Sequence, residues 1–275
     1  MVDNSTGDGR PPRHPAGPRR NGPARRNPSG PRRPGPERSR GPRPARAADE
    51  PDRSPGQGPS IPPTVEAKQL SPEIRAELTT LDRATADTVA RHLVAAGELL
   101  DEDPQAALAH AQAARNRSGR IAAIREAVGI AAYFCGDWAQ ALSEFRAARR
   151  MGSKSQLLPL IADCERGVGR PERAIELARS AEAAELTGDD ADEMRIVVAG
   201  ARADLGHLDQ AIAVLSSPPL DPTRTGDTPA RLFYAYAETL LALGRTEEAV
   251  QWFVHSAAAD VDGVTDAEDR IEELT

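Results

Sequence analysis

The sequence predicts an all-α fold, a solenoid of about five helix pairs that follows a disordered N-terminal tail. The first 64 residues are rich in Arg, Pro and Gly, strand-forming residues are few after them, and one alanine pattern recurs five times in the remainder. Apolar residues in that remainder recur at spacings of three and four, the period of an amphipathic helix, as at Leu93, Ala96, Leu99 and Leu100.

The tail, residues 1–64, holds 13 arginines, no lysine and six acidic residues, so its net charge is +7. Because the whole chain carries −7, residues 65–275 carry −14. The tail also contains 16 of the 24 prolines and very few aliphatic side chains. It cannot bury enough apolar surface to offset the entropy of ordering its backbone, so we expect disorder with polyproline II character.

The helical part is predicted to have three sections. Ser71 and Pro72 supply an N-cap and a proline at the first helical position, which predicts an N-terminal helix over 71–83. Glycine or proline then recurs through 84–258, the predicted repeat domain, at intervals that suit antiparallel helices of about a dozen residues. Thr265 and Glu268 have the spacing of a capping box, which predicts a C-terminal capping helix over 265–274.

The repeat domain contains five segments that align on one alanine. A glycine lies five residues before the alanine in four of them, and a small residue lies twelve residues before it in all five. Two helices that cross closely need small side chains at the contact, and glycine can end a helix with a positive φ. The residues that define the repeat are Ala107, Ala141, Ala174, Ala211 and Ala249, with Gly136, Gly169, Gly206, Gly244 and, at the earlier small position, Gly129.

This pattern resembles the tetratricopeptide repeat, a helix–turn–helix unit of 34 residues, since successive alanines here are 34, 33, 37 and 38 residues apart. The chain is similar in this respect to tetratricopeptide-repeat proteins of high-GC Gram-positive bacteria. The resemblance implies a right-handed superhelical solenoid whose first helices line a concave groove. It also implies that a partner protein or peptide binds in that groove.

The small crossing residues set the register of the expected groove. The side chains placed on its surface are His92, Glu126, Tyr133, Asp163, Arg166, Arg231, Tyr234 and Glu238. Tyr133 and Tyr234 are equally compatible with a packing role. The carboxylate clamps of the family use Lys, Asn and Arg on this face. These positions hold neither Lys nor Asn, so we expect a basic or amphipathic peptide instead.

No catalytic, cofactor-binding or metal-binding pattern is found in the sequence. The five histidines are scattered without ligand spacing, and no phosphate-binding glycine loop or nucleophile motif occurs in the helical part. The acidic run 189–193 lacks the glycine and the spacing of a calcium loop, and acids in a first helical turn complement the helix dipole. Cys135 and Cys164 are expected to be inert packing thiols. We therefore predict a protein that is not an enzyme and uses neither cofactor nor metal.

The N-terminus lacks an apolar signal stretch, and the longest apolar run is shorter than a membrane span, so we expect a cytoplasmic protein without membrane contact. The leading functional hypothesis is a non-catalytic scaffold that binds a partner protein. The alternative is an RNA- or ribosome-associated protein tethered by its Arg-rich tail. Because the tail has no aromatic residue, such contact with RNA is expected to be weak and salt-sensitive. Two other roles stay open for the tail, a spacer and a segment that occludes the groove.

Overall fold

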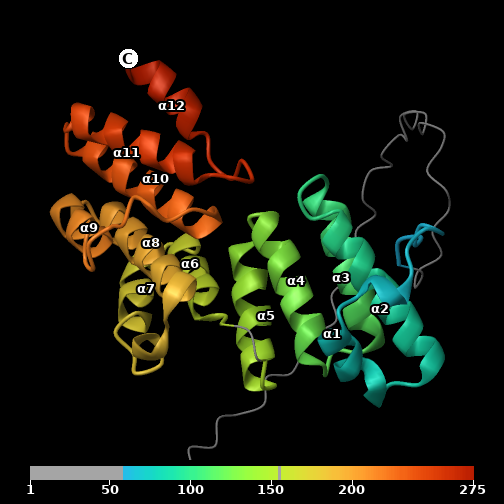
Figure 1. Cartoon of the computed structure of the whole chain (residues 1–275). Helices are drawn as coiled ribbons and strands as arrows, with labels where there is room; N and C mark the ends of the chain where they lie inside the picture. Colours follow the sequence, from blue (N-terminus) through green and yellow to red (C-terminus); the bar gives the residue numbers. More distant parts are fainter. Residues whose placement is uncertain (1–57, 154–155) are drawn as a thin grey trace, which may run out of the picture. The chain divides into compact units, whose positions relative to one another are not determined.

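The structure, a computed structural model, describes residues 58–153 and 156–275, so most of the predicted tail lies outside the described residues. Within these ranges the chain forms α-helices, three short 3-10 helices and no strands, which confirms the predicted all-α fold (Figure 1). The 3-10 helices are Ala67–Gln69, Leu78–Thr80 and Ala183–Glu185. The α-helices are α1 (Pro72–Glu77), α2 (Arg83–Glu98), α3 (Pro104–Arg117), α4 (Ala122–Phe134), α5 (Trp138–Arg150), α6 (Leu158–Gly167), α7 (Pro171–Leu177), α8 (Gly188–Asp204), α9 (Leu208–Leu215), α10 (Asp227–Ala242), α11 (Thr246–Ala259) and α12 (Ala267–Leu274).

Consecutive helices form five pairs, α2 with α3, α4 with α5, α6 with α7, α8 with α9 and α10 with α11 (Figure 1). The second helix of each pair also contacts the helix that follows it, so that α12 covers α11. Among the first helices, α2 contacts α4, α6 contacts α8 and α8 contacts α10, whereas α4 is not closely packed against α6. The architecture is therefore the expected all-α solenoid of tetratricopeptide-type helix pairs.

The repeat-defining residues lie at the contacts between paired helices. All five aligned alanines are fully buried, with 0% of their surface exposed. Gly129 of α4 shows how close the contact is, because a Cβ atom there would lie 2.6 Å from two ring carbons of Phe145 in α5. Gly136 ends the same pair's first helix with a φ of +71°, a conformation that costs an L-residue free energy. The small residues are thus required by the helix crossings and turns.

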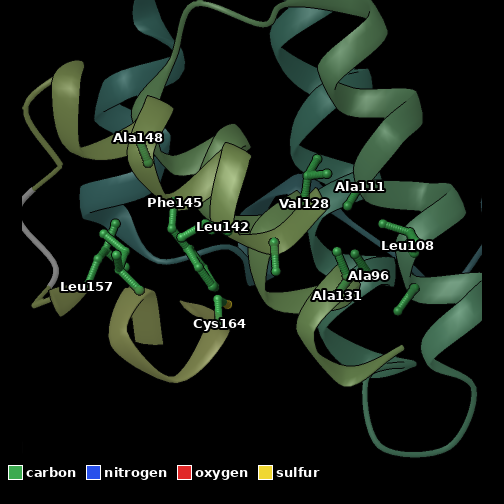
Figure 2. Packing of buried hydrophobic residues seen from close by; sticks show 14 residues of the cluster. Ala96, Leu108, Ala111, Val128, Ala131, Leu142, Phe145, Ala148, Leu157 and Cys164 are labelled. Atoms are coloured by element: carbon green, nitrogen blue, oxygen red, sulfur yellow. The ribbon is translucent and has the colours of Figure 1, made fainter. Parts of the chain in front are cut away.

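Phe145 is the largest side chain of the core that joins the second and third pairs. It is 0% exposed and packs in one cluster with Leu142 of its own helix and with Leu157 and Cys164 at α6 (Figure 2). Burial, together with neighbouring carboxylates, raises the pKa of the Cys164 thiol to about 12. That thiol therefore stays protonated at neutral pH and serves in packing.

Glu144 of α5 is a buried charge at the contact of the first two pairs. Its side chain is 5% exposed and accepts hydrogen bonds from Arg115 of α3 and Arg125 of α4, the second at 2.9 Å. One carboxylate thus links three helices. Removing it would leave two guanidinium groups without this partner.

The N-terminal helix predicted over 71–83 starts where expected but is shorter in the structure. Ser71 is the expected N-cap, and its Oγ accepts a hydrogen bond from the backbone N–H of Ile74 at 3.4 Å. The helix that follows is short, however, because α1 ends at Glu77 and a 3-10 turn leads into α2. Helical structure also begins earlier than Ser71, at Ala67.

The predicted capping box at Thr265 is wrong. The backbone N–H and the hydroxyl of Thr265 both donate to the carboxylate of Asp260, each at 2.7 Å. Asp266 is instead the N-cap of α12, and its side chain makes no capping hydrogen bond. Because Thr265 binds the carboxylate of Asp260 at the end of α11, the loop before α12 is held to the fifth pair.

The acidic run at the start of α8 does more than complement the helix dipole. Asp192 is 6% exposed, and its two oxygens each accept from an arginine at 2.6 Å, Oδ1 from Arg195 and Oδ2 from Arg224. Arg195 also donates to the carbonyl of Pro218 at 2.9 Å. This network fastens the loop between the fourth and fifth pairs to α8.

In the described residues no helix has the length and apolarity needed to span a bilayer.

Candidate functional site

A hollow of about 590 Å³ lies among the first helices of four pairs. We call it the first hollow. Its lining comes mainly from α4, α6, α8 and α10. The apolar part consists of Ile130, Phe134, Phe145, Pro159, Leu160, Ile196 and Val197. The polar part consists of Tyr133, Gln156, Asp163, Arg166, Asp190, Glu193 and Arg231.

A second hollow, of about 400 Å³, adjoins the first. Both are lined by Ile196 of α8 and Arg231 of α10, so these two side chains stand at their common border. The remaining lining of the second hollow comes from α10 and from the segment that leads into α12, namely Tyr234, Ala235, Val264, Thr265 and Asp266. We call the two hollows together the groove.

The structure brings five of the eight predicted groove residues to this groove. The first hollow contains Tyr133, Asp163, Arg166 and Arg231, and the second contains Tyr234. Their role in binding a partner stays a prediction. The signal that placed them was the register set by the small crossing residues.

Two other predicted groove residues lie outside the hollows. Glu126 of α4 accepts a hydrogen bond from the hydroxyl of Ser153, in the segment after α5. Glu238 of α10 binds Arg270 of α12 at 2.9 Å, and Arg270 in turn lies over the ring of Phe253. Glu238 therefore helps to hold the last helix.

His92 does not belong to a groove, and its predicted placement there is corrected. Its side chain is buried, 2% exposed, and its Nδ1 lies 3.0 Å from Nδ1 of His110 in α3. Burial lowers the pKa of His92 to about 4, with a further contribution from the positive charges of Arg117 and Arg91. The two histidines lie one helical turn from the crossing residues of the first pair, which is a signal that sequence analysis missed.

One wall of the first hollow is a chain of polar contacts that links α4, α6 and α8. The hydroxyl of Tyr133 donates to Asp163, which also accepts from Arg166 at 2.9 Å. The Nε–H of Arg166 donates to the carboxylate of Asp204 at 2.6 Å. The guanidinium group passes over Gly200, where a Cβ atom would lie only 2.9 Å from the guanidinium carbon. Burial and the negative charge of Asp163 raise the pKa of Tyr133, so its hydroxyl remains a donor.

The start of α8 contributes acidic side chains to the lining of the first hollow. Glu193 binds Arg231 at 3.0 Å and accepts from the hydroxyl of Thr228 at 3.2 Å. Burial raises the pKa of Glu193, although Arg231 opposes this shift. Asp190 lies one turn earlier, is exposed and forms no salt bridge with any described residue. This part of the lining therefore presents one carboxylate that is already neutralised and one that is not.

The floor of the first hollow is apolar and partly open to solvent. Phe134, the last residue of α4, is 48% exposed. Tyr133, its neighbour, stacks edge to face against Trp138 with ring centroids 4.9 Å apart. Among the described residues no group of three or more side chains is arranged to hold a metal ion. An apolar floor between walls of largely paired charges suits the binding of a side chain from another molecule.

Residues 161–264 match a family model described as tetratrico peptide repeat. This range begins in α6 and ends beyond α11, so it includes the helices that form most of the groove. That part of the chain is similar to a repeat family whose members generally mediate contacts between proteins. The comparison with curated proteins gave no match.

Proposed function

We propose that the protein is a non-catalytic scaffold that binds a segment of a partner protein in the groove. The observation that carries the proposal is the first hollow, an apolar-floored space of about 590 Å³ among four first helices of the solenoid. Its volume lies within the range of about 300 to 1,000 Å³ in which binding pockets usually fall. The match of residues 161–264 to the tetratrico peptide repeat supports the same function.

Exposed apolar side chains at the groove supply the driving force for binding. Phe134 and Val264 are 48% and 43% exposed, and they belong to the first and the second hollow respectively. Covering such surface contributes about 25 cal/mol for each Å² removed from water. The paired polar wall needs no rearrangement when a partner binds, which keeps the entropic cost of association low.

The test compares two arginine substitutions at sites of equal exposure. Phe134→Arg places a charge on the floor of the first hollow, whereas Val254→Arg changes a residue of α11 that is also 48% exposed and lies outside both hollows. The full-length protein and both variants are used as baits for quantitative affinity purification from the native host. Thermal melting checks that the three baits are equally folded.

We expect at least one protein to be retained by the wild type and by Val254→Arg and to be lost with Phe134→Arg. The purified partner should then bind the wild type in calorimetry at least tenfold more tightly than it binds Phe134→Arg, because a buried unpaired charge costs more than about 1.4 kcal/mol. If Phe134→Arg retains every partner as well as the control does, the groove is not the binding surface.

The alternative in which the Arg-rich tail tethers RNA concerns a segment whose arginines all lie outside the described part of the chain. It stays a prediction from composition alone, as does the cytoplasmic location. A gel shift with non-specific RNA checks the tail, because binding through counterion release has to weaken steeply as salt is raised.

A further inference from the structure

We infer that the groove selects a basic amphipathic segment, which places one apolar side chain in each hollow and a lysine or arginine near Asp190 and near Asp266. The inference rests on the proposed function and specifies the chemistry of the partner. Three features of the groove carry it, namely the continuity of its apolar surface, the state of its arginines and the position of its unpaired carboxylates.

The apolar surface continues from one hollow to the next. The first hollow offers Phe134 and Leu160, the second offers Val264 and Ala235, and Ile196 belongs to both. Because Ile196 lies at the border, one segment can reach both hollows without leaving the protein surface. A helix with apolar residues every three or four positions, or an extended strand with alternate ones, presents side chains in this way.

The two arginines of the groove are already engaged. Arg166 binds Asp163 and Asp204 at 2.9 and 2.6 Å, and Arg231 binds Glu193 at 3.0 Å. A partner carboxylate would have to displace one of these bonds, and it would meet an acidic lining of four carboxylates and two guanidinium groups. The groove is therefore unsuited to an acidic segment or to a chain terminus held by its carboxylate.

Each hollow also has one exposed carboxylate without a cationic partner among the described residues. Asp190 is this residue in the first hollow. Asp266 is its counterpart in the second, where it lies beside Tyr234, whose pKa it helps to raise. A cation of the partner can pair with either carboxylate without breaking an existing bond. The charge of −14 on residues 65–275 adds long-range attraction for a basic segment.

The experiment uses the full chain and three synthetic peptides of about 16 residues, a length that spans several helical turns. The first peptide has Leu on one helical face and Lys on the other. The second replaces Lys by Glu, and the third replaces Leu by Ser. Fluorescence anisotropy measures the Kd of each peptide at ionic strengths of about 0.05 M and 0.3 M, which bracket the range where screening between exposed charges becomes strong.

Two double variants raise the net charge by the same amount. Asp190→Asn with Asp266→Asn neutralises the groove carboxylates. Glu172→Gln with Asp209→Asn neutralises two exposed acids in the first turns of α7 and α9, outside both hollows. The Leu/Lys peptide should bind the wild type at least tenfold more tightly than either other peptide. The groove variant should weaken it about four- to twenty-fivefold, since each of the two exposed pairs contributes about two- to fivefold, and the matched control less than twofold.

Three results would overturn the inference: no peptide binds, both double variants weaken the Leu/Lys peptide equally, or the Leu/Glu peptide binds best and depends on Phe134. The last of these leaves the proposed function standing, because the groove would still bind a protein segment, although one of different charge. The proposed function fails separately if Phe134→Arg alters neither peptide binding nor partner capture. The two proposals are thus tested by different variants.

Discussion

The buried pair of His92 and His110 makes the first helix pair sensitive to acid. The two Nδ1 atoms are 3.0 Å apart, so one imidazole donates and the other accepts. Burial lowers the pKa of both rings, so both are neutral at neutral pH. A proton on His92 would lie in a site that is only 2% exposed and close to Arg117 and Arg91. Burial and these charges together lower its pKa from 6.5 to about 4.

The sign and the size of the effect follow from this shift. Above pH 6.5 the His92 ring is neutral in both the folded and the unfolded chain, so this group does not lower the free energy of unfolding. Between pH 6.5 and pH 4 the unfolded chain takes up a proton that the folded protein cannot, so stability falls as the pH falls. The loss reaches about 3 kcal/mol at pH 4, because each pKa unit corresponds to about 1.4 kcal/mol.

The measurement is urea denaturation, followed by circular dichroism, at several pH values between about 7.5 and 4, a window that spans the ordinary and the lowered pKa. His92→Gln removes the titrating group, and His207→Gln, at an exposed residue that precedes α9, serves as the control. The free energy of unfolding of the wild type and of the control should fall about 2 to 3 kcal/mol further than that of His92→Gln. If all three proteins lose equal stability, the ring is protonated in the folded state and the reasoning fails.

Three further predictions test the packing, and each is measured as the free energy of unfolding in urea. Phe145→Ala should cost about 3 to 5 kcal/mol, as expected for a fully buried aromatic residue, and a cost below 1 kcal/mol would contradict its position in the core. Glu144→Ala should cost about 2 to 3 kcal/mol, because its two arginine partners keep partial access to water, whereas Glu176→Ala at an exposed pair should cost less than 1 kcal/mol. Gly136→Ala, at a φ of +71°, should destabilise by about 1 to 2 kcal/mol, and Gly97→Ala, in α2 with open space around it, should stabilise by about 0.5 to 1 kcal/mol; effects of equal sign would refute the turn geometry.

The fold was predictable from the sequence because its determinants repeat at short range. A small residue at each helix crossing is a steric requirement, and five copies of that requirement stand out in a single chain. Gly129 illustrates this, since any side chain there would meet the ring of Phe145. The helix-ending glycine at position 136 is equally local, because it depends only on the backbone of one turn.

The candidate site was predicted in part, because register identifies the face of a helix but not the partner of a side chain. The register correctly predicted that Tyr133 and Arg231 lie at the groove. It also predicted His92 there, although that side chain is buried. Side-chain partners depend on the angle and distance between neighbouring pairs, which the repeat pattern does not specify. Two such contacts escaped sequence analysis, the course of Arg166 across Gly200 and the capture of Thr265 by Asp260.

α6, which contributes to the first hollow, is the shortest first helix of the five pairs. α6 has 10 residues, whereas α8 has 17, so α6 is shorter by about 10 Å at a rise of 1.5 Å per residue. Pro159 lies in its first turn, where proline is tolerated, and a helix continued N-terminally past this residue would lose a hydrogen bond and clash with the preceding turn. Gln156, Pro159 and Leu160, at the start of α6, line the first hollow. The proline that keeps α6 short is thus itself part of the apolar lining to which we expect a partner to bind.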